Sequence, residues 1–123
     1  TTLDLKTRDA IALAVSEVNQ CSYCLAAHTW VSMQFAKIPP DEIVRNRHGQ
    51  STDPKRAAAA SFAAKLVQLR GKVASEDVQA LRAAGYSEAN VLEIIALASQ
   101  FLMTNLINNA MDTTVDFPPK VAA

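Results

Sequence analysis

The sequence predicts an all-α fold of about six helices in a single domain over residues 1–123. Three observations favour this class. Apolar residues recur at helical spacing between charged ones, as at Ile11, Ala14, Val15 and Val18. Helix start and stop signals recur along the chain, and no period-2 alternation is long enough for a strand. With 123 residues, 50% of them hydrophobic, the chain can bury a core.

The first two helices meet at a weak joint. Residues 3–18 form an amphipathic helix with Asp4 or Thr7 as its N-cap. At Asn19 and Gln20 the helix either continues or breaks, in which case Asn19 caps a new helix. The second helix runs to about residue 37, because the prolines that follow disfavour helical backbone before them.

The remaining helices have clear boundary signals. A short third helix starts at Pro40, and Asp53-Pro54 is an N-cap followed by proline at the first helical position. Gly71 is the expected C-cap of that fourth helix, and Gly85 closes the fifth. Ser87-Glu88 opens the last and longest helix. The expected helices cover residues 3–18, 19–37, 40–47, 54–69, 75–84 and 88–111, and an extended tail covers 112–123.

The last helix is apolar on more than one face. A helix that is hydrophobic all round is buried, and in a small domain a second subunit can cover one face. This pattern predicts a homo-oligomer; the alternative is a central core helix within a monomer. The residues concerned are Leu92, Ile94, Ile95, Leu97, Phe101, Leu102, Met103, Leu106 and Ile107.

Charge and composition argue against several classes of function. The 12 basic and 12 acidic side chains balance, so nothing predicts binding to nucleic acid or to an anionic membrane surface. The sequence shows no signal peptide and no long uncharged apolar run. Two cysteines in a Cys-x-x-Cys, without a secretory context, indicate a reducing compartment, and we expect a cytoplasmic protein.

The chemistry-bearing stretch lies at the start of the second helix. On a continuous helix, Glu17, Cys21, Cys24 and His28 fall on one face, at offsets of four, three and four residues. A cysteine thiolate is the nucleophilic form, and the unpaired N–H groups of a helix N-terminus favour it. Because His28 is four residues after Cys24, it can reach that sulfur but hardly the sulfur of Cys21. We therefore expect Cys24 to attack, His28 to manage its proton and Cys21 to resolve the oxidised sulfur.

Two other interpretations use the same residues. A zinc site could be built from Cys21, Cys24, His28 and His48, although three ligands on successive turns of one helix are unusual for a closed tetrahedral site. The two cysteines could also be inert buried thiols that behave as small hydrophobes. The neighbouring acid and imidazole argue against an inert pocket.

The stretch from Ala14 to His28 resembles the core motif of the AhpD-like alkylhydroperoxidases of the carboxymuconolactone decarboxylase superfamily. Residues 104–109 and 112–118 are similar to the peroxidase-related branch of that superfamily. The resemblance implies a compact all-helical fold, assembly as trimers or hexamers, and reduction of hydroperoxides by the cysteine pair. It implies that Cys24 attacks, with Cys21 and His28 as its partners. It also implies a dithiol reductant, such as a lipoyl-bearing or thioredoxin-like protein.

The sequence departs from the family pattern at two positions. Asp9 stands where the family has its relay glutamate, and it is one methylene shorter; Glu17 could take over if the helix is continuous. Tyr23 stands where some members have a histidine, and its hydroxyl could position a water, since it does not titrate near neutral pH. The alternative for Tyr23 is simple packing, and for Asp9 a first-turn acid that favours its helix.

A second polar cluster lies near the end of the last helix. Asparagines are poor helix formers, so the cluster formed by Asn105, Asn108, Asn109 and Asp112 needs a reason. The four could line a pocket or bond across a subunit interface. They could equally be the solvated end of a fraying helix.

The leading functional hypothesis is a peroxidase or thiol–disulfide oxidoreductase that needs no metal and no organic cofactor. The alternative is a non-catalytic oligomeric module whose dithiol senses redox state or latches a partner. A lactone decarboxylase activity ranks lower, because it does not call for a cysteine pair.

Overall fold

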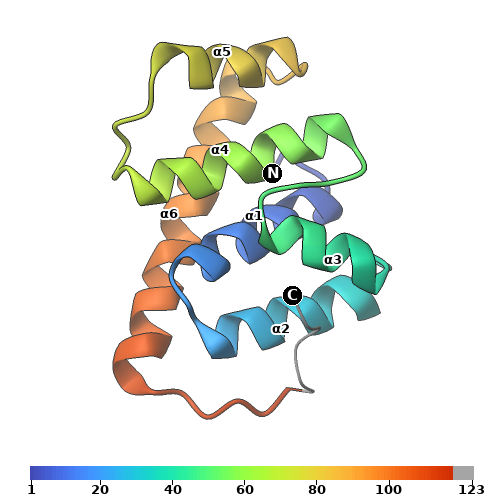
Figure 1. The fold of residues 1–123 in the computed structure, drawn as a ribbon, viewed down its shortest axis with the longest axis vertical. Helices are drawn as coiled ribbons and strands as arrows, with labels where there is room; N and C mark the ends of the chain where they lie inside the picture. Colours follow the sequence, from blue (N-terminus) through green and yellow to red (C-terminus); the bar gives the residue numbers. More distant parts are fainter. Residues whose placement is uncertain (118–123) are drawn as a thin grey trace.

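The computed structural model describes residues 1–117, and over that range it is all-helical, which confirms the predicted fold class (Figure 1). The expected tail is described only as far as Phe117, and the rest of it, residues 118–123, lies outside the described part. The helices are α1 Leu5–Val18, α2 Ser22–Gln34, α3 Pro40–Arg47, α4 Pro54–Gln68, α5 Ser75–Ala83 and α6 Glu88–Met111.

Helix α1 is the centre of the fold. It packs against α2, α3, α4 and α6, and nine of its residues are buried. Small side chains allow this close packing on several sides, since Ala10 and Ala14 meet Ala60 of α4 in a fully buried cluster. Figure 1 shows α6 running beside α4 and α1 from the α5 end of the molecule to the α2 end. The end of α6 is therefore brought to the start of α2.

The chain breaks between α1 and α2, so the continuous helix is not formed. Gln20 is left-handed (φ 52°), its N–H donates to the Glu17 carbonyl at 3.3 Å, and the Cys21 N–H donates to the Ser16 carbonyl at 3.1 Å. This is the double hydrogen bond of a Schellman motif. Of the two predicted alternatives the break is the one observed, but the residue that caps α2 is Cys21 and not Asn19.

Most other boundaries agree with the local signals. Asp4 caps α1, Asp53 caps α4 with proline at the first position, and Ser87 caps α6. Two boundaries differ. Helix α2 ends at Gln34, three residues before the expected Lys37, and the C-cap of α4 is Leu69 and not Gly71. The backbone at Lys37 is left-handed (φ 57°), and the turn that carries it sends the Ile38 N–H back to the Ser32 carbonyl at 2.9 Å.

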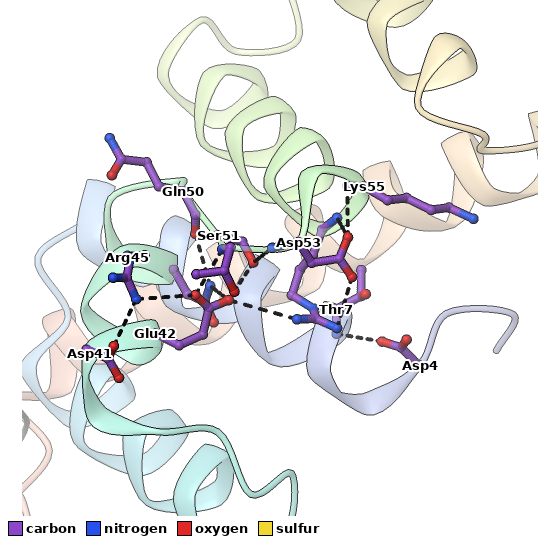
Figure 2. Close-up of polar contacts among 12 residues, drawn as sticks. Asp4, Thr7, Asp41, Glu42, Arg45, Gln50, Ser51, Asp53 and Lys55 are labelled. Atoms are coloured by element: carbon purple, nitrogen blue, oxygen red, sulfur yellow. Dashed lines mark hydrogen bonds and ion pairs between the residues drawn. The ribbon is translucent and has the colours of Figure 1, made fainter.

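The connection from α3 to α4 is held by one buried acid, Glu42 (Figure 2). Its carboxylate accepts hydrogen bonds from the Ser51 hydroxyl, from the Thr52 N–H at 3.1 Å and from the Asn46 amide at 3.3 Å, and it lies 3.9 Å from Arg56. Burial raises the pKa of Glu42, but these hydrogen bonds outweigh it and leave the pKa below its ordinary value. The cluster ties α3 to the loop that follows it and to the first turn of α4.

Helix α6 is only partly covered in the single chain. Val91, Ile94, Ala98 and Asn105 are its buried residues, whereas Leu92, Met103, Leu106, Ile107 and Met111 are exposed. Among the described residues it is also the one helix whose length and composition would allow it to cross a membrane. Core helices of soluble proteins share this length and composition, so the pattern does not identify a membrane span.

Candidate functional site

The two cysteines are joined in a disulfide at the N-terminus of α2. Cys21 is the N-cap, and its sulfur accepts a hydrogen bond from the Cys24 N–H at 3.2 Å. Cys21 is fully buried and Cys24 is 3% exposed. The pair therefore sits at the positive end of the helix dipole, which favours a thiolate once the disulfide is reduced.

Helix α6 contributes two contacts to the sulfur of Cys24. The side-chain amide of Asn108 donates to Cys24 Sγ at 3.6 Å, and the Thr104 carbonyl oxygen lies 4.0 Å from the same sulfur. In the sequence, Asn108 belongs to the polar cluster near the end of the last helix, and nothing there indicates a contact with Cys24. The two residues are 84 positions apart, so only the packing of α6 on α2 reveals the contact.

The other asparagines clamp the joint between α1 and α2. Asn105 is fully buried; its amide nitrogen donates to Ser16 Oγ at 3.0 Å and its oxygen accepts from Asn19 Nδ2 at 3.0 Å. Asn109 donates to the Asn19 carbonyl at 2.9 Å. These bonds lie within the chain, and they give the buried Asn105 partners inside the fold, while Asn109 stays exposed. The fourth member, Asp112, is instead the left-handed C-cap of α6.

The predicted imidazole faces Asp9. His28 Nδ1 lies 3.9 Å from Asp9 Oδ1, and the ring makes a T-shaped contact with Phe101 of α6, with centroids 5.3 Å apart. At 3.9 Å the two are an ion pair when the imidazole is protonated, but they are too far apart for a hydrogen bond. The donors to the two sulfurs are the Cys24 N–H and the Asn108 amide, so among the described residues His28 bonds to neither sulfur of the oxidised pair.

The other candidate acid points elsewhere. Glu17 forms an ion pair with Arg47 of α3, with oxygen–nitrogen distances of 3.1 and 3.3 Å. The break at Gln20 removes the continuous helix on which the Glu17 alternative depended. The structure thus brings Asp9, rather than Glu17, to His28.

Tyr23 lies on the outer side of α2. Its ring makes a T-shaped contact with the Phe117 ring, with centroids 5.7 Å apart, and Phe117 also contacts Trp30, about two turns further along the same side of α2. The contact with Phe117 therefore agrees with the interpretation that Tyr23 is a packing residue. His48 is an exposed residue at the C-cap of α3, and within residues 1–117 no three His, Cys, Asp or Glu side chains are grouped as a metal site.

The fold and the site define an all-helical protein with a disulfide-forming cysteine pair at a helix N-terminus. The chain belongs to the carboxymuconolactone decarboxylase family, whose family model matches residues 1–69. No curated protein matches the chain.

Two solved structures share the fold. One is an uncharacterized peroxidase-related protein from Silicibacter sp. TM1040, with 27% identity and a TM-score of 0.80. The other is an uncharacterized peroxidase-related protein with an alkylhydroperoxidase AhpD core from Ralstonia eutropha JMP134, with 25% identity and a TM-score of 0.80. In both, the match covers 98% of this chain but 62% of the other.

Proposed function

We propose that this chain is a peroxidase that reduces alkyl hydroperoxides through Cys21 and Cys24 and is recycled as a thiol–disulfide oxidoreductase. The observation that carries the proposal is the cysteine pair at the start of α2, close enough to form a disulfide. The AhpD-like fold and the two peroxidase-related structures support it.

The reaction starts from the reduced pair. The Cys24 thiolate attacks the distal oxygen of the hydroperoxide, the O–O bond breaks, and an alkoxide leaves while Cys24 becomes a sulfenic acid. The alkoxide takes a proton and departs as the alcohol. The Cys21 thiol then attacks the Cys24 sulfur, the S–O bond breaks, and water and the disulfide form. A dithiol reductant restores both thiols by exchange and is itself oxidised to a disulfide.

His28 and Asp9 supply the proton transfer. The Asp9 carboxylate faces Nδ1 at 3.9 Å, which leaves the other ring nitrogen to exchange protons with the site. His28 does not touch the sulfur of the disulfide, so in the proposed reaction the proton passes through a water or the substrate oxygen. Glu17 is committed to Arg47 and is not assigned this role. Tyr23 takes no part in the transfer, and its ring packs against Phe117.

The partners follow from the same features. The reductant is a lipoyl-bearing or thioredoxin-like protein, which suits a cytoplasmic location. The exposed apolar residues of α6 support a homo-oligomer, a trimer or a hexamer, because a second subunit would cover them.

The second candidate is a redox sensor without turnover. It is favoured by the burial of the pair, since Cys21 is fully buried and Cys24 is 3% exposed, which limits access for a protein reductant. The lactone decarboxylase activity in the family's name calls for no cysteine pair and ranks below both.

Steady-state peroxide consumption separates the candidates. With excess cumene hydroperoxide and a dihydrolipoamide-regenerating system, the wild type should turn over many times, Cys24→Ser should not react, and Cys21→Ser should stop at a sulfenic acid that dimedone traps. A single stoichiometric oxidation would favour the sensor. Turnover that survives Cys24→Ser would exclude the proposed mechanism.

A further inference from the structure

The side chain of Asn108 donates a hydrogen bond to the Cys24 sulfur, and the mechanism proposed above gives it no role. Asn108 Nδ2 lies 3.6 Å from Cys24 Sγ, and the same nitrogen donates to the Thr104 carbonyl at 2.9 Å. A primary amide carries two N–H groups, so both contacts can be made at once.

The second contact fixes which way the amide points. The Thr104 carbonyl can only accept a hydrogen bond, so the atom that faces it must be the amide nitrogen and not the oxygen. The remaining N–H is then the one directed at the sulfur. This donor is uncharged and does not titrate, so it acts at every pH at which the protein is folded.

The donor is also held in place. Asn105, one turn earlier on α6, is fully buried, bonds to both Asn19 and Ser16, and so ties α6 to the joint that leads into Cys21. Asn108 therefore does not need to be ordered when the disulfide opens. A donor aimed at sulfur strengthens when the sulfur carries a full negative charge, and a buried thiolate without such a donor is disfavoured.

We propose that Asn108 is a catalytic residue whose amide N–H stabilises the Cys24 thiolate. The inference rests on the proposed function in one respect, namely that Cys24 is the attacking cysteine. Thr104 positions the amide through its backbone carbonyl, and the reduced sulfur accepts the hydrogen bond in place of the disulfide sulfur.

Alkylation of Cys24 tests the inference without peroxide or reductant. In a Cys21→Ser background no intramolecular disulfide forms, and iodoacetamide reacts with the Cys24 thiolate to form an S–C bond while iodide leaves. The rate is followed across pH. Asn108→Leu removes the donor at nearly constant volume, and we expect the midpoint of the profile to rise and the rate at neutral pH to fall about tenfold.

Asn109→Leu is the matched control, because it removes a bond to Asn19 at the same helical end but none to the sulfur. It should keep the parent profile. Asn108→Gln keeps an amide and should recover part of the rate. If Asn108→Leu does not fold, as judged by circular dichroism, Asn108→Ala takes its place with the same expectation.

An unchanged profile in the folded Asn108 variant would overturn the inference, as would an equal change in Asn109→Leu. The result is separable from the proposed function. A shifted alkylation profile in a protein that shows no peroxide turnover would keep the role of Asn108 and reject the peroxidase. Turnover with an unshifted profile would do the reverse.

Discussion

His28 Nδ1 lies 3.9 Å from Asp9 Oδ1, across the contact between α2 and α1. The acid comes from the first turns of α1, 19 residues before the histidine, and it is buried while Glu17 is paired with Arg47. An aspartate in place of the longer family glutamate still reaches the neighbourhood of the ring. The site therefore contains an acid–imidazole pair on two helices, and the acid of that pair is Asp9.

Asp9→Asn should lower peroxide turnover about tenfold or more, because the amide keeps the shape of the side chain but carries no negative charge to face the ring during proton transfer. The measurement is kcat with saturating dithiol reductant. Glu17→Gln is the comparison. It loses the ion pair with Arg47, so the free energy of unfolding should fall, while kcat should stay close to that of the wild type. The opposite pattern, with turnover lost in Glu17→Gln and kept in Asp9→Asn, would assign the relay to Glu17.

Cys21 has a structural role besides its redox one. Its sulfur accepts the Cys24 N–H as the N-cap of α2, and a serine oxygen can replace it in that role, whereas an alanine cannot. Under reducing conditions Cys21→Ala should therefore be less stable than Cys21→Ser by about 1 kcal/mol. Urea unfolding at neutral pH measures the difference. Equal midpoints for the two variants would show that the sulfur does not act as a cap.

The clamp at the end of α6 should be important for stability. Asn105→Leu replaces a fully buried amide and leaves Asn19 Nδ2 and Ser16 Oγ without their partners. Leaving buried polar groups unsatisfied costs about 1–3 kcal/mol each, so the midpoint of thermal unfolding should drop well below that of the wild type. Asn109→Leu, which loses one bond to a more exposed carbonyl, should lose less. A larger loss in the Asn109 variant would place the main support of the joint elsewhere.

Sequence alone predicted the elements whose signals are local. The caps Asp4, Asp53 and Ser87 each accept a backbone N–H in the first turn of the helix that follows, and such contacts depend on neighbours in the chain. The joint at residues 19–20 was ambiguous because neither residue is a glycine. Gln20 adopts a left-handed backbone there only because the Schellman bonds and the clamp from α6 hold it.

The site was predictable in part for the same reason. The spacing of Cys21, Cys24 and His28 is visible in one segment, and so is the likeness to a known motif. The contact of Asn108 with Cys24 joins residues 84 positions apart. The pairing of Glu17 with Arg47 spans 30 positions and follows from the packing of α3 on α1. Periodicity within a helix cannot show which distant helix faces it.

Glu42 predicts a pH dependence of stability. Its folded pKa is held below the ordinary value of 4.5, so the ionised form is favoured in the folded state, and the stabilisation is present above about pH 4.5 and lost as the pH falls through the folded pKa. Wild type and Glu42→Gln should therefore differ in urea midpoint at neutral pH and converge as the pH falls through the folded pKa of Glu42. A difference that does not change with pH would mean that packing, and not the charge, makes the contribution.

The exposed apolar residues of α6 predict self-association. Met103 and Ile107 lie one turn apart and are 55% and 52% exposed, and Leu106 beside them is 57% exposed. Burying side chains of this size stabilises an interface by about 1.5–3 kcal/mol each. Sedimentation velocity should find the wild type as an oligomer and the double variant Met103→Ser, Ile107→Ser as smaller species. Val115→Ser, at an exposed apolar residue outside the helices, should leave the assembly intact. A wild type that sediments as a monomer at micromolar concentration would mean that α6 stays uncovered by a second copy.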